Sequence, residues 1–353
     1  MFHGSKPGWF LSARAVVAGC ALFLGGFLGV VETAEASSIR ETTIDSVALG
    51  RPLAVAIYRP DDPPPPSGWP VLYLLHGLNG GYRDWVTLGD VQGTLDRLIA
   101  TRRIRPMVVV MPDAGNSWYV DSAAMGGPGD FETAILVDLP RAIEEDLPVR
   151  RQREGRAIAG LSMGGYGALR LSFKRPDRYC AVASLSGAIW QNMQPDSAVD
   201  ATIHAAAAND YFRRVDPATI VSGIDRPPGA GHFGGVFGKP FDAQRFNAAN
   251  VFTLLAEQLH AGVQLPAIYL TVGDHDSHNL WRGSIALYET LMADGVNVDF
   301  RVTGGDHAWS LWRKSIEDAL VFVDSKFVEP SSSAKIASGP AAPKFAGAEI
   351  EAK

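Results

Sequence analysis

The sequence has little cysteine and no excess of positive charge. Its 353 residues include two cysteines, and lysine plus arginine (32) is outnumbered by aspartate plus glutamate (38), for a formal net charge of −6 at pH 7. A mildly acidic chain without a basic run gives no electrostatic reason to expect nucleic acid or an anionic membrane surface as a partner. Loss of an N-terminal leader would leave Cys180 alone, which excludes an intramolecular disulfide and suggests a buried, apolar cysteine.

Long apolar runs are also missing, except near the N-terminus. Basic residues precede an apolar run from Ala15 to Val31, and the small-residue site Ala34-Glu35-Ala36 follows it. This order predicts a secretory signal peptide over residues 1–36, cleaved near Ala36-Ser37, and a secreted or periplasmic protein with no stable membrane insertion after cleavage. An uncleaved anchor is one alternative. Lipoprotein processing at Cys20 is another, although this cysteine lies inside the apolar run.

Residues 37–328 are expected to form one catalytic domain, and the Ala-, Pro- and Lys-rich residues 329–353 a disordered tail. Apolar or β-branched runs alternate with helical patterns, which predicts an α/β fold: a mostly parallel central sheet with helices on both faces. The predicted strands are Leu53–Tyr58, Val71–Leu75, Met107–Met111, Ala157–Ala159, Ala181–Leu185, Ile268–Val272 and Val298–Val302, and the predicted helices are Asp130–Leu147 (kinked at Pro140), Met163–Arg175, Trp281–Asp294 and Trp309–Phe327.

The strongest local motif is G-x-S-x-G, in Gly160-Leu161-Ser162-Met163-Gly164. A serine nucleophile stands on a tight turn between a strand and a helix, where neighbouring glycines relieve crowding. The helix then directs its N-terminal N–H groups at a developing oxyanion. The pentapeptide alone can arise by chance, but a predicted strand precedes it and a predicted helix follows it. Ser162 is therefore the candidate nucleophile.

Two later loops contain a candidate acid and base in the order that this arrangement requires. Asp276 follows the predicted strand that ends at Val272, and His307 follows the one that ends at Val302. Because ligands bind beyond the carboxyl ends of the strands in open α/β sheets, both residues should face Ser162. His307 would take the proton of Ser162, and Asp276 would orient its imidazole. Asp274 is the alternative acid.

A metal site is the competing interpretation of these loops. Together they contain six aspartates and histidines, which are residue types found in zinc and dinuclear metal sites. No His-x-x-x-His pair lies on a predicted helix, however, and a metal would leave the G-x-S-x-G turn unexplained. No metal and no cofactor is predicted, and His275 and His278 are expected to be solvated loop residues.

An oxyanion hole needs two N–H donors. The backbone N–H of Met163, which follows the nucleophile, is the first candidate. The second is the N–H of Leu78, in the loop His76-Gly77-Leu78 that follows the strand Val71–Leu75. On its own this loop could be a simple flexible turn. Beside a serine, a histidine and an aspartate in the expected order, it is a candidate catalytic loop.

With these pieces in order, the chain resembles the esterase D and antigen 85 group of the α/β-hydrolase superfamily, which includes bacterial feruloyl and acetyl-xylan esterases. The resemblance spans about Val71 to Trp312. It implies the α/β-hydrolase fold, Ser162, Asp276 and His307 as the triad, and Leu78 and Met163 as oxyanion donors. The matching segments are Tyr73–Leu78, Asp84-Trp85, Met111–Tyr119, Phe131–Pro140, Gly160–Gly165 and Gly304–Trp309 with Trp312.

The departures from the family pattern bear on the substrate. His76 stands where antigen 85 proteins carry an acidic residue, as it does in feruloyl-type esterases, which weakens a mycolyltransferase assignment. The export signal weakens a cytosolic S-formylglutathione hydrolase role. His76, Trp118 and Tyr119 are the candidate substrate contacts. The aromatic-rich segment from Trp190 to Phe252 could line a pocket, but core packing is the favoured explanation.

The leading hypothesis is an exported serine esterase that acts on a small-molecule or carbohydrate-linked ester through an acyl-enzyme on Ser162. The alternative is a secreted acyltransferase of antigen 85 type, which would pass the acyl group to a sugar hydroxyl. A metallohydrolase, and a binding protein that has lost catalysis, are less favoured because the serine motif is complete. The sequence does not indicate an oligomeric state.

Overall fold

The computed structural model describes residues 37–192 and 233–329. The predicted signal peptide, Cys20, residues 330–353 of the predicted tail and part of the aromatic-rich segment, with Tyr211 and Phe212, lie outside the described residues. In the part that is described, no helix is both long and apolar enough to cross a membrane.

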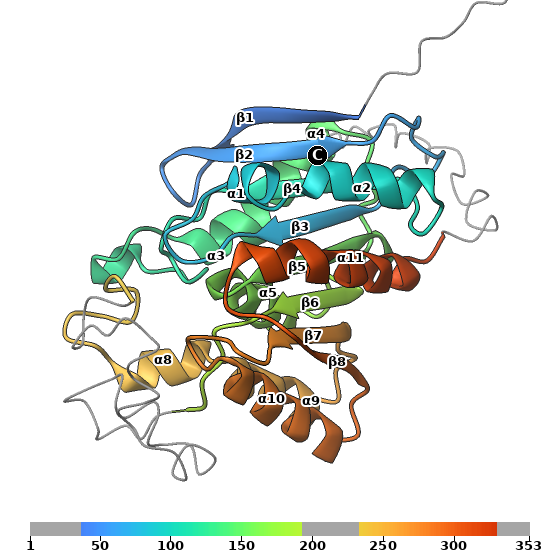
Figure 1. The fold of residues 1–353 in the computed structure, drawn as a ribbon. Coiled ribbons are helices and arrows are strands. Elements are labelled where there is room, and N and C mark those ends of the chain that lie inside the picture. Colours follow the sequence, from blue (N-terminus) through green and yellow to red (C-terminus); the bar gives the residue numbers. More distant parts are fainter. Residues whose placement is uncertain (1–36, 193–232, 330–353) are drawn as a thin grey trace, which may run out of the picture. The chain divides into compact units, whose positions relative to one another are not determined.

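The described chain forms an eight-stranded sheet with strand order β1-β2-β4-β3-β5-β6-β7-β8 (Figure 1). The strands are β1 (Ser38–Ser46), β2 (Arg51–Arg59), β3 (Val71–Leu75), β4 (Val108–Pro112), β5 (Arg156–Leu161), β6 (Ala181–Leu185), β7 (Ala267–Gly273) and β8 (Val298–Thr303). β1 and β2 pair antiparallel, as do β2 and β4, and all pairs from β4 to β8 are parallel. The predicted mostly parallel α/β sheet is therefore confirmed.

Alternate side chains of the central strands enter two separate cores. Val71, Tyr73 and Leu75 of β3 belong to one core, and Leu72 and Leu74 to the other. Successive side chains point to opposite faces of a strand, so a strand covered on both faces must be apolar throughout. This is why β3 to β6 read as continuous apolar runs.

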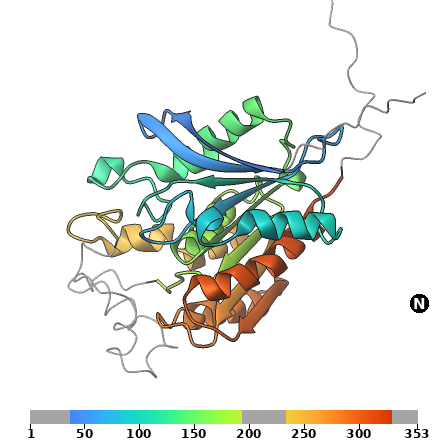
Figure 2. The same ribbon diagram turned by 45° about the horizontal axis from the view of Figure 1, so that its top comes forward.

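Helices cover both faces of the sheet. Residues of α1, α2 and α11 form one core with it, and residues of α3 to α5 and α8 to α10 form the other. Figure 2 shows α2 and α11 side by side, where Arg97 donates a 2.6 Å hydrogen bond to Glu317. The helices are α1 (Asp84–Thr87), α2 (Val91–Ala100), α3 (Phe131–Thr133), α4 (Leu139–Asp146), α5 (Met163–Lys174), α8 (Ala243–Ala249), α9 (Val251–His260), α10 (Trp281–Ala293) and α11 (Trp309–Lys326).

The predicted helix Asp130–Leu147 is divided. Between α3 and α4 the residues Ala134–Asp138 form a π-helical turn. Pro140 has no N–H to donate to the carbonyl of Leu136, and its ring would crowd that carbonyl in a regular α-helix. A wider turn just before the proline relieves this conflict.

Cys180 directly precedes β6 and is buried, with 8% of its surface exposed. Its thiol donates to the carbonyl of Arg156, at an Sγ–O distance of 3.2 Å. Burial raises the pKa of the Cys180 thiol to about 11. The thiol is therefore protonated at neutral pH and packs as an apolar group, as the sequence predicts.

Candidate active site

Ser162 lies on the turn between β5 and α5, in a backbone conformation that non-glycine residues rarely adopt. Its φ and ψ are 53° and −118°. Its N–H donates to the carbonyl of Leu185 at 2.9 Å, and its carbonyl accepts from the N–H of Ala188 at 3.0 Å. Such strain persists only where the surroundings enforce it, and it is commonest at functional sites. The turn presents the Ser162 hydroxyl beyond the carboxyl end of β5.

The glycines that flank Ser162 allow backbone segments to pack without side chains between them. A Cβ added to Gly160 would lie 2.4 Å from the carbonyl oxygen of Gly164. A Cβ added to Gly164 would lie 2.5 Å from the carbonyl oxygen of His76 and 2.6 Å from that of Leu75. The first turn of α5 therefore rests directly on the end of β3 and the loop that follows it.

We expect Gly164→Ala to destabilise the fold by about 1–3 kcal/mol, because the added methyl group must displace backbone rather than a flexible side chain. The same displacement moves the His76 loop, so esterase activity should fall as well. Urea unfolding measures the first effect. Gly304→Ala is the matched control, since nothing lies within 4 Å of a Cβ at that position. Equal stability of the two variants would contradict the close approach.

The side chains of Ser162, His307 and Asp276 lie in a row, with the His307 ring between the other two. The Nε2 atom of His307 lies 2.9 Å from the hydroxyl oxygen of Ser162. Its Nδ1 atom lies 2.8 Å from Oδ2 of Asp276. The histidine and aspartate side chains are 8% and 0% exposed. Both hydrogen bonds are therefore largely shielded from water, which strengthens them and fixes the ring.

The two remaining carboxylates of these loops have other partners. Oδ1 of Asp274 accepts from the N–H of Gly305 at 2.9 Å, and it lies 2.6 Å from Nδ1 of His275. The hydrogen bond from Gly305, followed by that from His275, lowers the pKa of Asp274, which is exposed. Oδ1 of Asp306 accepts from the N–H groups of Ser277 (2.7 Å) and His307 (2.6 Å). Asp306 thus ties the loop after β7 to the loop after β8.

The imidazole of His307 also packs against two rings, in contacts that the sequence did not predict. Its centroid lies 4.7 Å from that of His278 and 4.9 Å from that of Trp312, each at an interplanar angle of 89°. His278 lies in a loop as predicted but is not fully solvated, because its ring packs edge-to-face on His307 and is half-buried. No motif spacing indicates this contact, since it depends on how the loop after β7 folds back.

Two backbone N–H groups beside Ser162 are unused, that of Leu78 in the loop after β3 and that of Met163 at the start of α5. In residues 37–192 and 233–329, neither the Leu78 nor the Met163 N–H has a hydrogen-bond acceptor. A Cβ added to Gly77 would lie 2.7 Å from Cδ1 of Leu161 and 3.4 Å from Cβ of Ser162, so this loop passes close to the serine. Buried N–H groups are normally satisfied, and a free pair here is suited to an anionic oxygen.

His76 fixes the orientation of the Gly77–Leu78 peptide. Its Nε2 accepts from the N–H of Ala114 at 2.9 Å, so the ring proton is on Nδ1, which donates to the carbonyl of Gly77 at 2.8 Å. The N–H of Gly80 donates to the same carbonyl at 3.1 Å. In a trans peptide the C=O and the following N–H point in opposite directions. Holding the Gly77 carbonyl therefore aims the Leu78 N–H.

These contacts change the interpretation of His76. It is 1% exposed, and both ring nitrogens bond to the backbone. We therefore assign it to the support of the loop and not to substrate contact. Burial lowers the pKa of His76 below its ordinary value of 6.5, which keeps the ring neutral and preserves the Nε2 acceptor.

This pKa shift predicts a pH dependence of stability. Below about pH 6.5 the unfolded chain binds a proton at His76 that the folded chain resists, so the free energy of unfolding falls as the pH falls, by up to about 1.4 kcal/mol per pH unit for this residue. The loss begins near 6.5 and ends at the lowered pKa of the folded state. Urea unfolding between pH 7 and 5 should show a smaller slope in His76→Asn than in the native protein. Parallel slopes would contradict the assignment.

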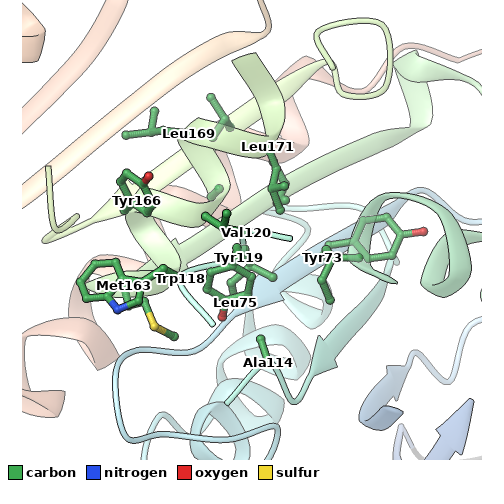
Figure 3. Close-up of a cluster of buried hydrophobic side chains, with 14 of the residues drawn as sticks. Tyr73, Leu75, Ala114, Trp118, Tyr119, Val120, Met163, Tyr166, Leu169 and Leu171 are labelled. Atoms are coloured by element: carbon green, nitrogen blue, oxygen red, sulfur yellow. The ribbon is translucent and has the colours of Figure 1, made fainter. Parts of the chain in front are cut away.

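Trp118 and Tyr119 are buried as well, with exposures of 2% and 0%. Figure 3 shows both among the buried side chains around α5. The Trp118 ring packs edge-to-face on Tyr166 and Phe233, at centroid distances of 5.8 and 5.0 Å. Four described phenylalanines of the aromatic-rich segment form one cluster with it, which favours core packing over an open pocket: Phe233, Phe237, Phe241 and Phe246.

The described ranges contain no candidate metal site. There, no group of three or more histidine, cysteine, aspartate or glutamate side chains is arranged to hold an ion. The acidic and histidine residues of the two loops bond instead to one another and to backbone N–H groups.

The strand order, the strained serine turn between β5 and α5 and the loops at the carboxyl ends of β7 and β8 define an α/β-hydrolase fold. A family model described as "Putative esterase" matches residues 46–323, and the chain belongs to this family. The resemblance found in the sequence is thereby confirmed.

Individual relatives include both hydrolases and a transferase. An acetyl esterase from Caldicellulosiruptor saccharolyticus is 27% identical over 70% of this chain and 81% of its own length. A diacylglycerol acyltransferase/mycolyltransferase from Mycobacterium leprae is 27% identical over 59% of this chain, which spans 62% of that relative. The solved structure of a ferulic acid esterase is 25% identical, with a TM-score of 0.58 over 83% of this chain and 99% of the other.

Proposed function

We propose that this chain is a serine esterase that hydrolyses carboxylic esters through an acyl-enzyme on Ser162. The observation that carries the proposal is the continuous hydrogen-bond path from the Ser162 hydroxyl through His307 to Asp276. Membership of the esterase family supports it independently. The N–H groups of Leu78 and Met163 are the proposed oxyanion donors.

In the first half of the reaction, the Ser162 oxygen attacks the ester carbonyl carbon while its proton passes to Nε2 of His307. The carbonyl oxygen becomes an oxyanion that the two N–H groups stabilise. Asp276 stabilises the imidazolium through Nδ1. The tetrahedral intermediate then expels the alkoxide, which takes the proton from Nε2 and leaves as the alcohol.

In the second half, water attacks the acyl carbon and gives a proton to Nε2 of His307. Collapse of the second tetrahedral intermediate returns that proton to the Ser162 oxygen and releases the carboxylic acid. The balance is one ester and one water consumed, and one acid and one alcohol formed. No cofactor enters these steps.

An acyltransferase is the second candidate, supported by the match to a mycolyltransferase. Both activities share the acyl-enzyme and differ in whether water or a sugar hydroxyl reaches it. Product analysis with and without trehalose or another sugar separates them: new acyl-sugar at the expense of free acid would favour transfer. The proposed export rests on residues 1–36, and the N-terminal mass of the mature protein tests it.

The experiment that tests the proposal is turnover of p-nitrophenyl esters, from acetate to long acyl chains, by the purified protein. We expect saturable hydrolysis with a preference among chain lengths that reports the room around Ser162. A protein inactive on every ester, with and without a sugar acceptor, would overturn the proposal and favour a non-catalytic role.

A further inference from the structure

Two consecutive bulky residues beside the candidate oxyanion loop have a left-handed backbone. The φ angles of Trp118 and Tyr119 are 52° and 56°. Aromatic residues seldom adopt this conformation, and two in succession are rarer still. Strain of this kind indicates that surrounding contacts hold the segment in place, and such segments cluster at functional sites.

An arginine of the nucleophile helix makes the contact that holds this segment. Nη1 of Arg170, on α5, donates to the carbonyl of Tyr119 at 2.8 Å. The Tyr119 N–H donates to the hydroxyl of Ser117 at 3.1 Å. The Tyr119 ring lies against Gly167, where an added Cβ would be 2.3 Å from Cδ2 of the ring. Tyr119 is thus held against the same helix that begins after Ser162.

Arg170 is itself fixed by a buried ion pair. Its side chain is 3% exposed and its Nη2 donates to Oε2 of Glu132, whose side chain is 10% exposed. Nζ of Lys174 lies 2.6 Å from the other carboxylate oxygen. Buried ion pairs add little net stability over well-packed apolar residues, so stability alone does not account for this one. The geometry that this pair fixes is that of the Tyr119 carbonyl.

From Tyr119 the path continues to the loop that carries Leu78. The Tyr119 hydroxyl donates to the carbonyl of His76 at 2.9 Å. The ring of His76 holds the Gly77 carbonyl, and that carbonyl determines where the Leu78 N–H points. Each link is a hydrogen bond between buried groups, so displacement at Arg170 would be transmitted and not absorbed by solvent.

We propose that Arg170, held by Glu132, is a positioning residue of the esterase: through Tyr119 and His76 it keeps the Leu78 N–H aimed at the oxyanion formed at Ser162. The inference rests on the proposed function. It extends the functional site to a residue that contacts neither Ser162 nor His307. Removing one oxyanion donor costs a factor of roughly 10² to 10³ in kcat, and misplacing one should cost about 10 to 100.

The test compares Tyr119→Phe, Arg170→Lys and Arg170→Met with the native protein. Tyr119→Phe deletes only the hydroxyl and keeps the ring. Arg170→Lys keeps the positive charge, but an ammonium group cannot donate to both Glu132 and the Tyr119 carbonyl as the guanidinium does. We expect kcat per titrated active site on p-nitrophenyl acetate to fall about 10- to 100-fold in Tyr119→Phe and Arg170→Met, and less in Arg170→Lys, with KM within about 3-fold.

A second readout is inhibition by phenylboronic acid, whose adduct with a serine is tetrahedral and anionic. Its inhibition constant should rise by a factor similar to the loss in kcat. The matched control is Arg156→Met, which breaks the ion pair with Glu144 at the first residue of β5, the end of the strand opposite Ser162. This control should lower the melting temperature and leave kcat per active site unchanged.

The outcomes separate the two proposals. Unchanged kcat and boronate inhibition in Tyr119→Phe and Arg170→Lys, in a native enzyme that turns over esters, would overturn the positioning role alone. Losses that follow melting temperature equally in these variants and in Arg156→Met would overturn it as well. An inactive native protein would overturn the esterase function and this inference with it. If Arg170→Met fails to fold, Tyr119→Phe decides.

Discussion

Ser162→Ala should lower kcat/KM on p-nitrophenyl esters by a factor of about 10⁴ to 10⁶, the loss expected when a member of an acyl-transfer triad is removed. The Nε2 atom of His307 lies 2.9 Å from the Ser162 hydroxyl, so this is the hydroxyl that we expect the ring to deprotonate. Alanine removes the proposed nucleophile and leaves the candidate oxyanion hole. The residual rate therefore measures what binding and oxyanion stabilisation achieve without covalent catalysis.

Ser172→Ala is the matched control for this variant. Ser172 lies on α5, the helix that begins after Ser162, is buried, and donates its hydroxyl to the carbonyl of Leu169 at 3.0 Å. It should retain native kcat/KM with at most a modest loss of stability. Equal activity of Ser162→Ala and the native protein would contradict the serine mechanism and favour a metallohydrolase. Inhibition by chelators would then be the next test.

The sequence predicts most directly the strands that are buried on both faces. β3 to β7 follow from largely apolar runs, because a strand between two helical layers has no polar face, whereas β8 at one edge of the sheet contains charged residues and is only partly buried. β1 was not predicted, because it lacks such an apolar run. It is an edge strand, Ser38–Ser46, whose residues are mostly polar and at least partly exposed, so it carries no apolar run and is ordered by pairing with β2. We therefore attribute the formation of β1 to its pairing with β2 and not to an apolar pattern in its own residues.

The candidate site likewise contains residues that the sequence could locate and residues whose roles it could not predict. The Ser162 turn and the loops of Asp276 and His307 could be located because motif spacing and strand ends place them at one edge of the sheet. The roles of His76, His278 and Arg170 could not, because each depends on side-chain contacts between segments far apart in sequence. Arg170 reads as an ordinary helix residue until Glu132 and the Tyr119 carbonyl are seen beside it.

His76 is a residue that the sequence identified but whose role it did not predict. It was one of the candidate substrate contacts. In the fold, the glycine turn directs the ring inward, where it bonds to Ala114 and to the Gly77 carbonyl. A residue next to a catalytic loop can thus support the loop without lining the pocket. The distinction requires the direction of the side chain, which sequence spacing does not contain.

Asp276→Asn should lower kcat by about 10⁴-fold while leaving the fold intact, the effect of presenting histidine with the wrong tautomer. Oδ1 of Asp276 accepts from the N–H groups of His278 (3.0 Å) and Leu280 (3.3 Å), and Oδ2 faces Nδ1 of His307. An asparagine will turn its oxygen toward the two backbone N–H groups. Its amide N–H₂ then faces Nδ1, which must give up its proton to accept a hydrogen bond, and the ring proton moves to Nε2.

With the proton on Nε2, His307 can no longer take the Ser162 proton, so the loss falls on kcat and not on folding. Asp274→Asn is the control, because Asp274 is exposed and bonds to Gly305 and His275. It should change kcat by less than about 10-fold. Kinetics on p-nitrophenyl acetate, with melting temperatures for both variants, decide between the two carboxylates. A large loss in Asp274→Asn with an active Asp276→Asn would reverse the assignment of the acid, whereas the opposite pattern would fix Asp276 as the residue that sets the tautomer of His307.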